Sequence, residues 1–335
     1  MISRNTYKPI WEARENSYSV DFNKYTPRKP KMEDNVKVFS TYNLETLAGD
    51  IDWRMFFHAW GLKGRFPEIL EEDSKKGREA RRLYREGQEM LGEMIEGDKV
   101  EARAVIGVFP AAGHHDDILV YTDDQRKDIR AALPMLRQQK YRSSRDGFLS
   151  LSDYVAPESS GINDYIGTFA CSAGFGAEEH IKKFEQQGDS YNSVMFRLIC
   201  DRLTEAFSEV LHREVRYKYW GYACGKPADG KELLKKPSEG IRPSPGYPSC
   251  PDHSLKQDIF HLMDVENTIG IQLKSSYAMH PSSSVCGFYF AMPQSKYFNL
   301  GKILGDQVSD YAKRRSIPEE SAKMLFKPFI LNDSQ

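Results

Sequence analysis

The chain has 335 residues, of which 40% are hydrophobic, and its 47 basic and 48 acidic residues give a net charge of −1. This balance, without a long basic block, lacks the electrostatic footprint of a nucleic-acid binder. No apolar run is long enough to cross a bilayer, and the first residues lack the apolar segment of a secretory signal. The five cysteines are scattered without a CxxC pair, which favours reduced thiols in the cytoplasm over a disulfide framework or a zinc site.

The first part of the chain reads as a connection. Residues 1–40 show no clear hydrophobic period, and Pro27 and Pro30 push the residues before them out of the helical region. We therefore expect an extended N-terminal connector over 1–40 and one domain over 41–330.

Three stretches have helical spacing. Residues 44–70 mix Leu, Ile, Trp and Phe at helical intervals, and Asp52 there reads as an N-cap or a surface acid. Residues 74–96 predict an amphipathic helix with a basic stripe, which could dock an acidic electron-transfer partner but is more simply a solvated, ion-paired face. Residues 190–216 predict the strongest helix, with Glu205 on its polar side.

Strand signals separate these helices. Residues 100–122 predict a hairpin with 111–117 at its tip, and we interpret the His-His-Asp-Asp cluster at 114–117 as a polar turn and not a metal site. Residues 124–165 are polar and irregular, which suits a connection across the surface, and 166–170 predict a short buried strand. Residues 271–280 and 284–292 predict an antiparallel pair.

The C-terminal part also predicts helices. Ser254 and Gln257 have the spacing of a capping box, as do Ser316 and Glu319, and 299–314 return to helical spacing. Helices and hairpins alternate without the βαβ rhythm of a doubly wound sheet. The fold class predicted is therefore α+β, a single mixed domain with a twisted antiparallel sheet flanked by helices.

One segment is unlike the rest of the chain. Residues 240–253, GIRPSPGYPSCPDH, hold four prolines and two glycines, so neither a helix nor a central strand can run through them. We call this segment the strap. It presents Arg242, Tyr247 and His253 on a stiff backbone, which suits a loop that binds a small charged ligand. A rigid surface connection is the alternative.

The strap closely resembles the RPxPGYPxCPxH loop of the C-terminal activation domain of cobalamin-dependent methionine synthase, which binds S-adenosylmethionine in that family. The resemblance continues through IDWRMFFHAWGLKGRFPEIL at 51–70, through DRLTEAFSEVLHREVR at 201–216 with YWGYA after it, and through 295–314. It spans roughly residues 40 to 325. It implies that family's fold, which is not a Rossmann methyltransferase fold.

The resemblance also implies the ligand contacts. At matching positions stand Asp52, Glu205, Arg242, Pro243, Gly246, Tyr247, Tyr297 and Phe298, and no catalytic residue or metal ligand is expected. His253 matches a position that faces cobalamin, although a loop histidine with local partners is an equal alternative.

The chemistry of S-adenosylmethionine fits these residue types. Arg242 offers a planar fork for the α-carboxylate. Asp52 and Glu205 are acids for the ammonium, the sulfonium or the ribose, and the sequence does not divide these tasks between them. Tyr247 and Tyr297 offer aromatic faces to a cation. The backbone of 243–246 would meet adenine or ribose.

The implied function is to present the methyl group of S-adenosylmethionine for the reductive methylation of cob(II)alamin. The cobalamin-ligating pattern D-x-H-x-x-G is missing, because Phe56 stands two residues before His58. The chain begins with Met, so we expect it to act in trans on a separate cobalamin-carrying subunit, with a flavodoxin-like or other reductase and little activity alone. The alternative is a non-catalytic factor that senses S-adenosylmethionine and binds a corrinoid protein.

Overall fold

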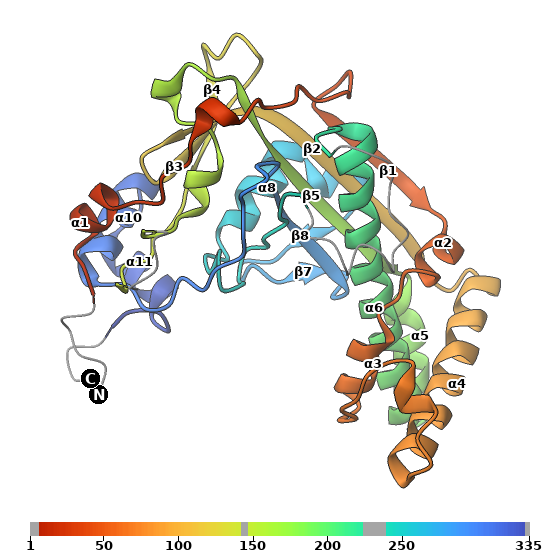
Figure 1. Cartoon of the computed structure of the whole chain (residues 1–335). Coiled ribbons are helices and arrows are strands. Elements are labelled where there is room, and N and C mark those ends of the chain that lie inside the picture. Colours follow the sequence, from red (N-terminus) through yellow and green to blue (C-terminus); the bar gives the residue numbers. More distant parts are fainter. Residues whose placement is uncertain (1–6, 142–146, 224–238, 332–335) are drawn as a thin grey trace.

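The computed structural model describes residues 7–141, 147–223 and 239–331, and it is built on one antiparallel sheet (Figure 1). The strands of this six-stranded sheet run in the order β4-β3-β2-β5-β8, and β1 pairs with β2 beyond that path. The strands are β1 (Val36–Tyr42), β2 (Glu101–His114), β3 (Asp117–Tyr121), β4 (Ile129–Pro134), β5 (Asp164–Phe175) and β8 (Ser284–Tyr289). A separate pair is formed by β6 (Gln272–Leu273) and β7 (Met279–His280).

The helices cover both faces of this sheet. They are α1 (Ile10–Glu15), α2 (Leu44–Ala48), α3 (Trp53–Ala59), α4 (Lys75–Glu96), α5 (Ala177–Gln186), α6 (Ser190–Glu214), α8 (Leu255–Met263), α9 (Val265–Ile269), α10 (Gly305–Arg315) and α11 (Glu319–Phe326). Short 3₁₀ turns occur at Phe22–Lys24, Glu68–Leu70, Leu151–Tyr154 and Glu158–Ser160, and a π-turn at Val215–Tyr219 follows α6. In Figure 1, α3, α4, α5 and the lower part of α6 project below the sheet.

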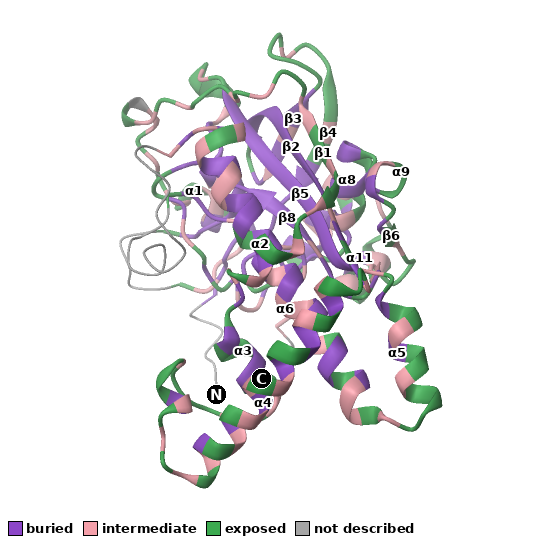
Figure 2. Ribbon diagram, turned by 90° about the vertical axis from the view of Figure 1, so that its right-hand side faces the viewer, coloured by how far each residue is buried: buried purple, intermediate pink, exposed green. Residues whose placement is uncertain are grey.

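Two hydrophobic cores lie on the two sides of the sheet, and β2 contributes to both. Ala104, Ile106 and Val108 face the core formed with α2 to α6, whereas Val105 and Phe109 face the core formed with α8 to α11. This alternation follows from the two-residue period of a strand. Because both faces are covered, β2 and β5 are buried along almost their whole length (Figure 2).

Several predictions from the sequence are confirmed. The fold class is α+β with an antiparallel sheet, and the two strongest helical signals correspond to α4 and α6. Ser74 caps α4, because its side chain accepts a hydrogen bond from the amide of Gly77. Arg82 on the basic stripe pairs with Glu79 and Glu86, which supports a solvated, ion-paired face.

The prediction for residues 124–165 is wrong. Instead of crossing the surface as an irregular connection, they supply β4 and buried side chains such as Leu136 and Tyr154. Arg137 is buried as well, because Asp116 and Asp153 neutralise it at 2.7 Å each. A polar sequence therefore forms part of the core here.

The strand predictions at 166–170 and 271–292 also need correction. The short buried strand is the twelve-residue β5, which pairs with β2 along most of its length. The predicted antiparallel pair does not form: β8 pairs with β5, and 271–280 instead fold back on themselves as β6 and β7. Period and composition identified β5 and β8, but the partners of these two strands come from distant parts of the chain.

Helix starts near the C-terminus differ from the prediction as well. The residues 299–304 precede α10, which begins at Gly305. The two predicted capping boxes do not form. Ser254 stands at the N-cap position of α8, but its side chain makes no capping hydrogen bond there. Ser316 instead ends α10, in the left-handed conformation. The division into 1–40 and 41–330 stays a prediction, and its boundary lies within β1.

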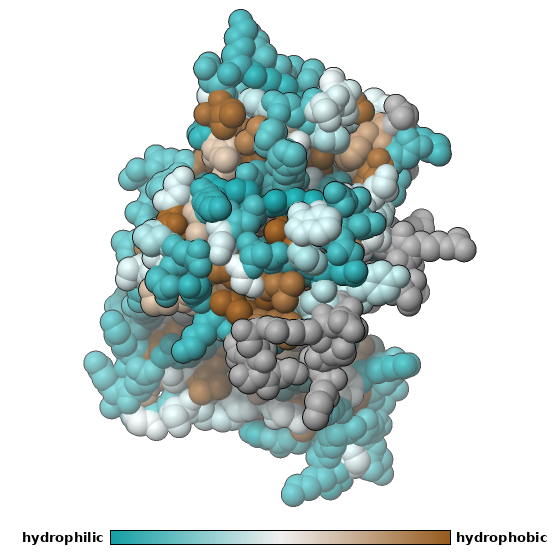
Figure 3. All heavy atoms as spheres, turned by 90° about the vertical axis from the view of Figure 1, so that its left-hand side faces the viewer, coloured by the Kyte–Doolittle hydropathy of each residue, from teal (hydrophilic) through white to brown (hydrophobic). Residues whose placement is uncertain are grey.

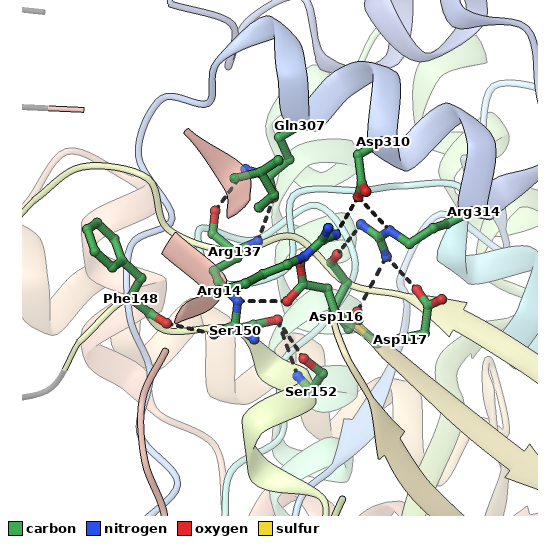
Figure 4. Close-up of polar contacts among 12 residues, drawn as sticks. Arg14, Asp116, Asp117, Arg137, Phe148, Ser150, Ser152, Gln307, Asp310 and Arg314 are labelled. Atoms are coloured by element: carbon green, nitrogen blue, oxygen red, sulfur yellow. Dashed lines mark hydrogen bonds and ion pairs between the residues drawn. The ribbon is translucent and has the colours of Figure 1, made fainter. Parts of the chain in front are cut away.

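A partly buried ion cluster ties α1 to the rest of the fold (Figure 4). We call this cluster, made by Arg14, Asp116, Arg137 and Asp310, the α1 clasp. The fully buried Asp116, in the turn between β2 and β3, accepts hydrogen bonds from Arg14 and Arg137 at 2.7 Å each. Arg14 also pairs with Asp310 of α10 at 2.6 Å. The side of the molecule that carries α1 and α10 is mainly hydrophilic (Figure 3).

Candidate functional site

The strap lies directly along the outer edge of β8. Ile241 and Phe290 exchange backbone hydrogen bonds of 3.0 and 2.9 Å, and the amide of Phe288 donates to the carbonyl of Pro243 at 2.9 Å. Gly287 permits this approach, because a Cβ there would stand 2.7 Å from the Pro243 oxygen. The first half of the strap is thus held as an added edge of the sheet.

The second half of the strap is a compact turn. The amide of Gly246 donates to the carbonyl of Cys250 at 2.7 Å, and the amide of Cys250 donates to the carbonyl of Tyr247 at 2.9 Å. The amide of Leu300 donates to the carbonyl of Pro248 at 2.9 Å. The first two bonds close the turn, and the third fixes it to the segment that carries residues 297–299.

Asp252 anchors the end of the strap. Its buried carboxylate accepts hydrogen bonds from the Ser254 amide at 2.8 Å and from the hydroxyl of Tyr311 on α10. Burial raises the pKa of Asp252 against the effect of these hydrogen bonds. The strap is therefore fixed both to the sheet and to a C-terminal helix.

A cavity of about 510 Å³ opens between the strap, α6, β8 and residues 297–299. Its volume lies in the range of about 300–1,000 Å³ that is usual for small-molecule sites. Tyr247 and Tyr297 are 57% and 59% exposed, which is unusual for aromatic side chains and leaves their rings accessible beside the cavity. The cavity is lined by Glu205, Arg242, Pro243, Ser244, Tyr247, Pro248, Ser249, Val285, Tyr297, Phe298 and Asn299.

Arg242 is held from two directions. Its backbone amide donates to the hydroxyl of Tyr297 at 2.9 Å, and its guanidinium donates to Ser208 at 3.0 Å and pairs with Glu209. Although burial opposes the charge, the carboxylates of Glu209 and Glu205 help to keep the pKa of Arg242 above its ordinary value. The cavity thus contains a permanent cation.

The acid of the cavity is Glu205, which α6 carries toward the strap. Burial raises the pKa of Tyr247, and the carboxylate of Glu205 adds to the rise. One cation, one carboxylate and two accessible aromatic rings therefore lie around the same space. Such a set can bind a zwitterion together with an additional positive centre.

Comparison with known families fits this geometry. Residues 43–316 match the family described as vitamin B12 dependent methionine synthase, activation domain. The chain belongs to this family. The resemblance inferred from the strap is confirmed.

A solved structure supports the same assignment. The crystal structure of the MetH reactivation domain bound to AdoHcy is similar to this chain, with a TM-score of 0.93 and 39% sequence identity. The similarity covers 98% of this chain and 99% of that chain. The activation-domain fold therefore extends over almost all of the sequence.

Six of the nine residues predicted for the activation-domain site line the cavity. They are Glu205, Arg242, Pro243, Tyr247, Tyr297 and Phe298. Their contacts with a ligand stay predictions, but the fold brings residues from α6, the strap and the 297–299 segment to one place.

Gly246 and His253 lie beside the cavity lining in the second half of the strap. Gly246 has φ +101°, and a Cβ there would stand 2.2 Å from the His253 ring. His253 is exposed, and burial of part of its ring with the nearby Lys256 lowers its pKa. The ring of His253 therefore packs on the glycine at the turn.

Asp52 lies at the start of α3. Its carboxylate accepts a hydrogen bond from the Arg54 amide at 3.0 Å and pairs with the Arg54 guanidinium at 2.6 Å. Hydrogen bonding from Arg54 lowers the pKa of Asp52. The N-cap interpretation of this residue is confirmed, and its role as a ligand contact stays a prediction.

Sequence reasoning missed other residues of this site. Ser208 and Glu209 contact Arg242 directly, and Glu205, Ser208 and Glu209 share one side of α6 because their spacing is i, i+3 and i+4. That spacing was the available signal. Lining residues such as Val285 and Asn299 carried no signal, since they reach the cavity only through tertiary contacts.

The described residues also limit other kinds of site. Among residues 7–141, 147–223 and 239–331, no group of three or more His, Cys, Asp or Glu side chains is arranged to hold a metal ion. No helix within these ranges has the length and apolarity that a membrane span requires. Cys171, Cys200, Cys250 and Cys286 are buried free thiols, and Cys224 lies outside the described residues.

Proposed function

We propose that this activation domain binds S-adenosylmethionine in the cavity between α6 and the strap and presents its methyl group for the reductive methylation of cob(II)alamin. The observation that carries the proposal is the convergence of Arg242, Glu205, Tyr247 and Tyr297 on one cavity of ligand size. The similar MetH reactivation domain was crystallised with AdoHcy, which differs from S-adenosylmethionine by one methyl group.

The residues present fit each part of this ligand. The Arg242 guanidinium would bind the α-carboxylate through charge-assisted hydrogen bonds. Glu205 is the acid that lines the cavity, and we assign the α-ammonium to it, with Asp52 as a second acid that would have to exchange Arg54 for the ligand. The rings of Tyr247 and Tyr297 would face the sulfonium.

The nucleoside end would lie along the strap. Pro243 and Gly246 bound the rigid backbone that would contact adenine or ribose, and Phe298 lines the same cavity. Because hydrogen bonds from Phe288 of β8 and to the carbonyl of Cys250 hold this backbone before ligand binding, little ordering entropy is lost when the ligand enters.

The protein's contribution would be position and not bond-making. When bound, S-adenosylmethionine supplies an electrophilic methyl group on its sulfonium. The side chains around the cavity would hold the sulfur in place, and we assign no proton transfer to any of them. His253, exposed at the end of the turn, would contact the cobalamin-carrying partner.

The remaining components would come from other proteins. We propose that this chain acts in trans, in the cytoplasm, on a cobalamin-carrying methionine synthase subunit, with a flavodoxin-like or other reductase as the electron source. The chain alone would bind S-adenosylmethionine with little or no turnover.

Ligand binding is the first test. Free S-adenosylmethionine at about 100 times its dissociation constant should stabilise the protein by roughly 2.7 kcal/mol, which a thermal-shift assay detects as a higher Tm. Adenosine at the same concentration is the matched control for the nucleoside alone. The same Tm with and without S-adenosylmethionine at saturating concentrations would refute the binding proposal.

Methyl transfer is the second test. The chain is mixed with a cobalamin-carrying subunit, a reductant and S-adenosylmethionine labelled in its methyl group. Label should appear on the cobalamin only when the chain and the reductant are both present. If the chain binds S-adenosylmethionine but the label stays on it, the alternative of a ligand-sensing interaction factor is correct.

A further inference from the structure

We infer that Ser208 and Glu209 on α6 are positioning residues that orient Arg242 for the carboxylate of an amino-acid-bearing ligand. The inference rests on the proposed function, because it concerns how the same cavity recognises its ligand. It assigns a role to two residues that do not line the cavity themselves.

The contacts show how the guanidinium is oriented. One terminal nitrogen of Arg242 donates to Ser208 Oγ at 3.0 Å, and the other donates to Glu209 Oε1. Two contacts from one helix define both the position and the plane of a planar group. The helix α6 therefore determines which N–H groups of Arg242 can point toward the cavity.

The hydroxyl of Ser208 can act only as an acceptor toward Arg242. It is fully buried, and its hydrogen is donated to the carbonyl of Glu205 at 2.8 Å. A hydroxyl has a single hydrogen, so a lone pair of the oxygen is directed at the guanidinium. Loss of this hydroxyl would leave a donor of Arg242 without its partner in a buried place.

Glu209 contacts the same group from the solvent side. Its side chain is 59% exposed, whereas the side chain of Arg242 is 17% exposed. The carboxylate therefore neutralises a cation that the protein buries, without entering the cavity. Because Glu205 lines the cavity one turn earlier on α6, this helix supplies both the acid for a ligand ammonium and the support for the cation.

The physical benefit is pre-organisation. An arginine side chain has several rotatable bonds, and ordering them during binding weakens affinity. With Ser208 and Glu209 in place, Arg242 is ordered before the ligand arrives. Removing either contact should therefore reduce affinity for ligands with an α-carboxylate and leave the nucleoside contacts along the strap unchanged.

The test compares two ligands on matched variants by calorimetry. S-adenosylhomocysteine carries the amino-acid group, and 5′-methylthioadenosine keeps the nucleoside and the sulfur but lacks that group. Ser208→Ala and Glu209→Ala should each weaken S-adenosylhomocysteine binding about tenfold, the scale of one lost hydrogen bond to a charged group. Their affinity for 5′-methylthioadenosine should match the wild type.

Glu209→Gln is the conservative control, because it keeps an acceptor of the same size without the charge. It should restore most of the affinity that Glu209→Ala loses. The ligand-free Tm of each variant establishes that it is folded. Unchanged or tighter S-adenosylhomocysteine binding by folded Ser208→Ala and Glu209→Ala would overturn the inference, as would equal losses for both ligands. Wild-type protein that binds neither ligand would instead overturn the proposed function.

Discussion

Gly246 is where the strap is most sensitive to a single methyl group. The residue has φ +101°, in the region that glycine favours, and its missing Cβ leaves room for the ring of His253. In Gly246→Ala the new Cβ would stand 2.2 Å from Cε1 and 2.7 Å from Nδ1 of that ring. Both the backbone and the histidine would have to move.

The expected cost has two parts. An alanine in a left-handed conformation costs about 1–3 kcal/mol, and a ring displaced from its preferred rotamer costs about 0.5–1.5 kcal/mol. We therefore expect Gly246→Ala to lower the free energy of unfolding by about 1.5–4.5 kcal/mol. It should also weaken S-adenosylmethionine binding, because the neighbouring Tyr247 lines the cavity.

Urea unfolding and calorimetry measure these two effects, and His253→Ala separates their causes. In the double variant the ring no longer obstructs the Cβ, so only the backbone part of the cost should remain. His253→Ala alone should bind S-adenosylmethionine nearly as well as the wild type. If Gly246→Ala unfolds at the wild-type urea concentration and binds with wild-type affinity, the crowding argument is wrong.

Three further predictions concern other parts of the site and the core. Arg242→Ala should weaken S-adenosylmethionine binding by about 1.5–3 kcal/mol in calorimetry. Tyr297→Ala should reduce the binding free energy by less. Unchanged affinity in folded Arg242→Ala would count against the carboxylate assignment. Tyr311→Phe removes a donor from buried Asp252 and should lower the free energy of unfolding by about 1–3 kcal/mol, so an unchanged urea midpoint would contradict the anchoring role. Burial raises the pKa of Asp164 from 3.8 to about 6, so the native state binds the proton more tightly and the stability that Asp164 contributes falls as pH rises between these values. The unfolding free energy of the wild type minus that of Asp164→Asn should therefore fall from pH 4 to pH 6. A difference that stays constant over this range would refute the raised pKa.

The helices could be predicted from the sequence to a large extent. The long helices α4 and α6 show apolar side chains at helical spacing, and this signal is local. The region 124–165 could not be predicted in the same way. Its charged residues resemble a surface segment, yet Arg137 is buried because it pairs with Asp153 further along the same region and with Asp116 outside it.

The site was predictable where a motif marks it. The strap, which includes Tyr247, stands out by its prolines, and the resemblance supplied Glu205 and Tyr297 from distant segments. Ser208 is different, because its spacing from Glu205 indicates only a shared side of the helix, and its contact with Arg242 exists only in the folded structure. The predicted pairing of β8 with residues 271–280 was wrong for a related reason. The alternation of side chains along a strand shows that it is a strand but does not show which strand lies beside it.

The α1 clasp has a consequence for how this protein is made. Arg14 bonds to Asp310, which the ribosome adds 296 residues later, and the amide of Ile10 bonds to Asp306 across the same separation. These bonds can form only after the ribosome has added the residues of α10. α1 therefore cannot complete these contacts while the residues between it and α10 are being synthesised, and this corner of the molecule forms later than contacts between neighbouring elements.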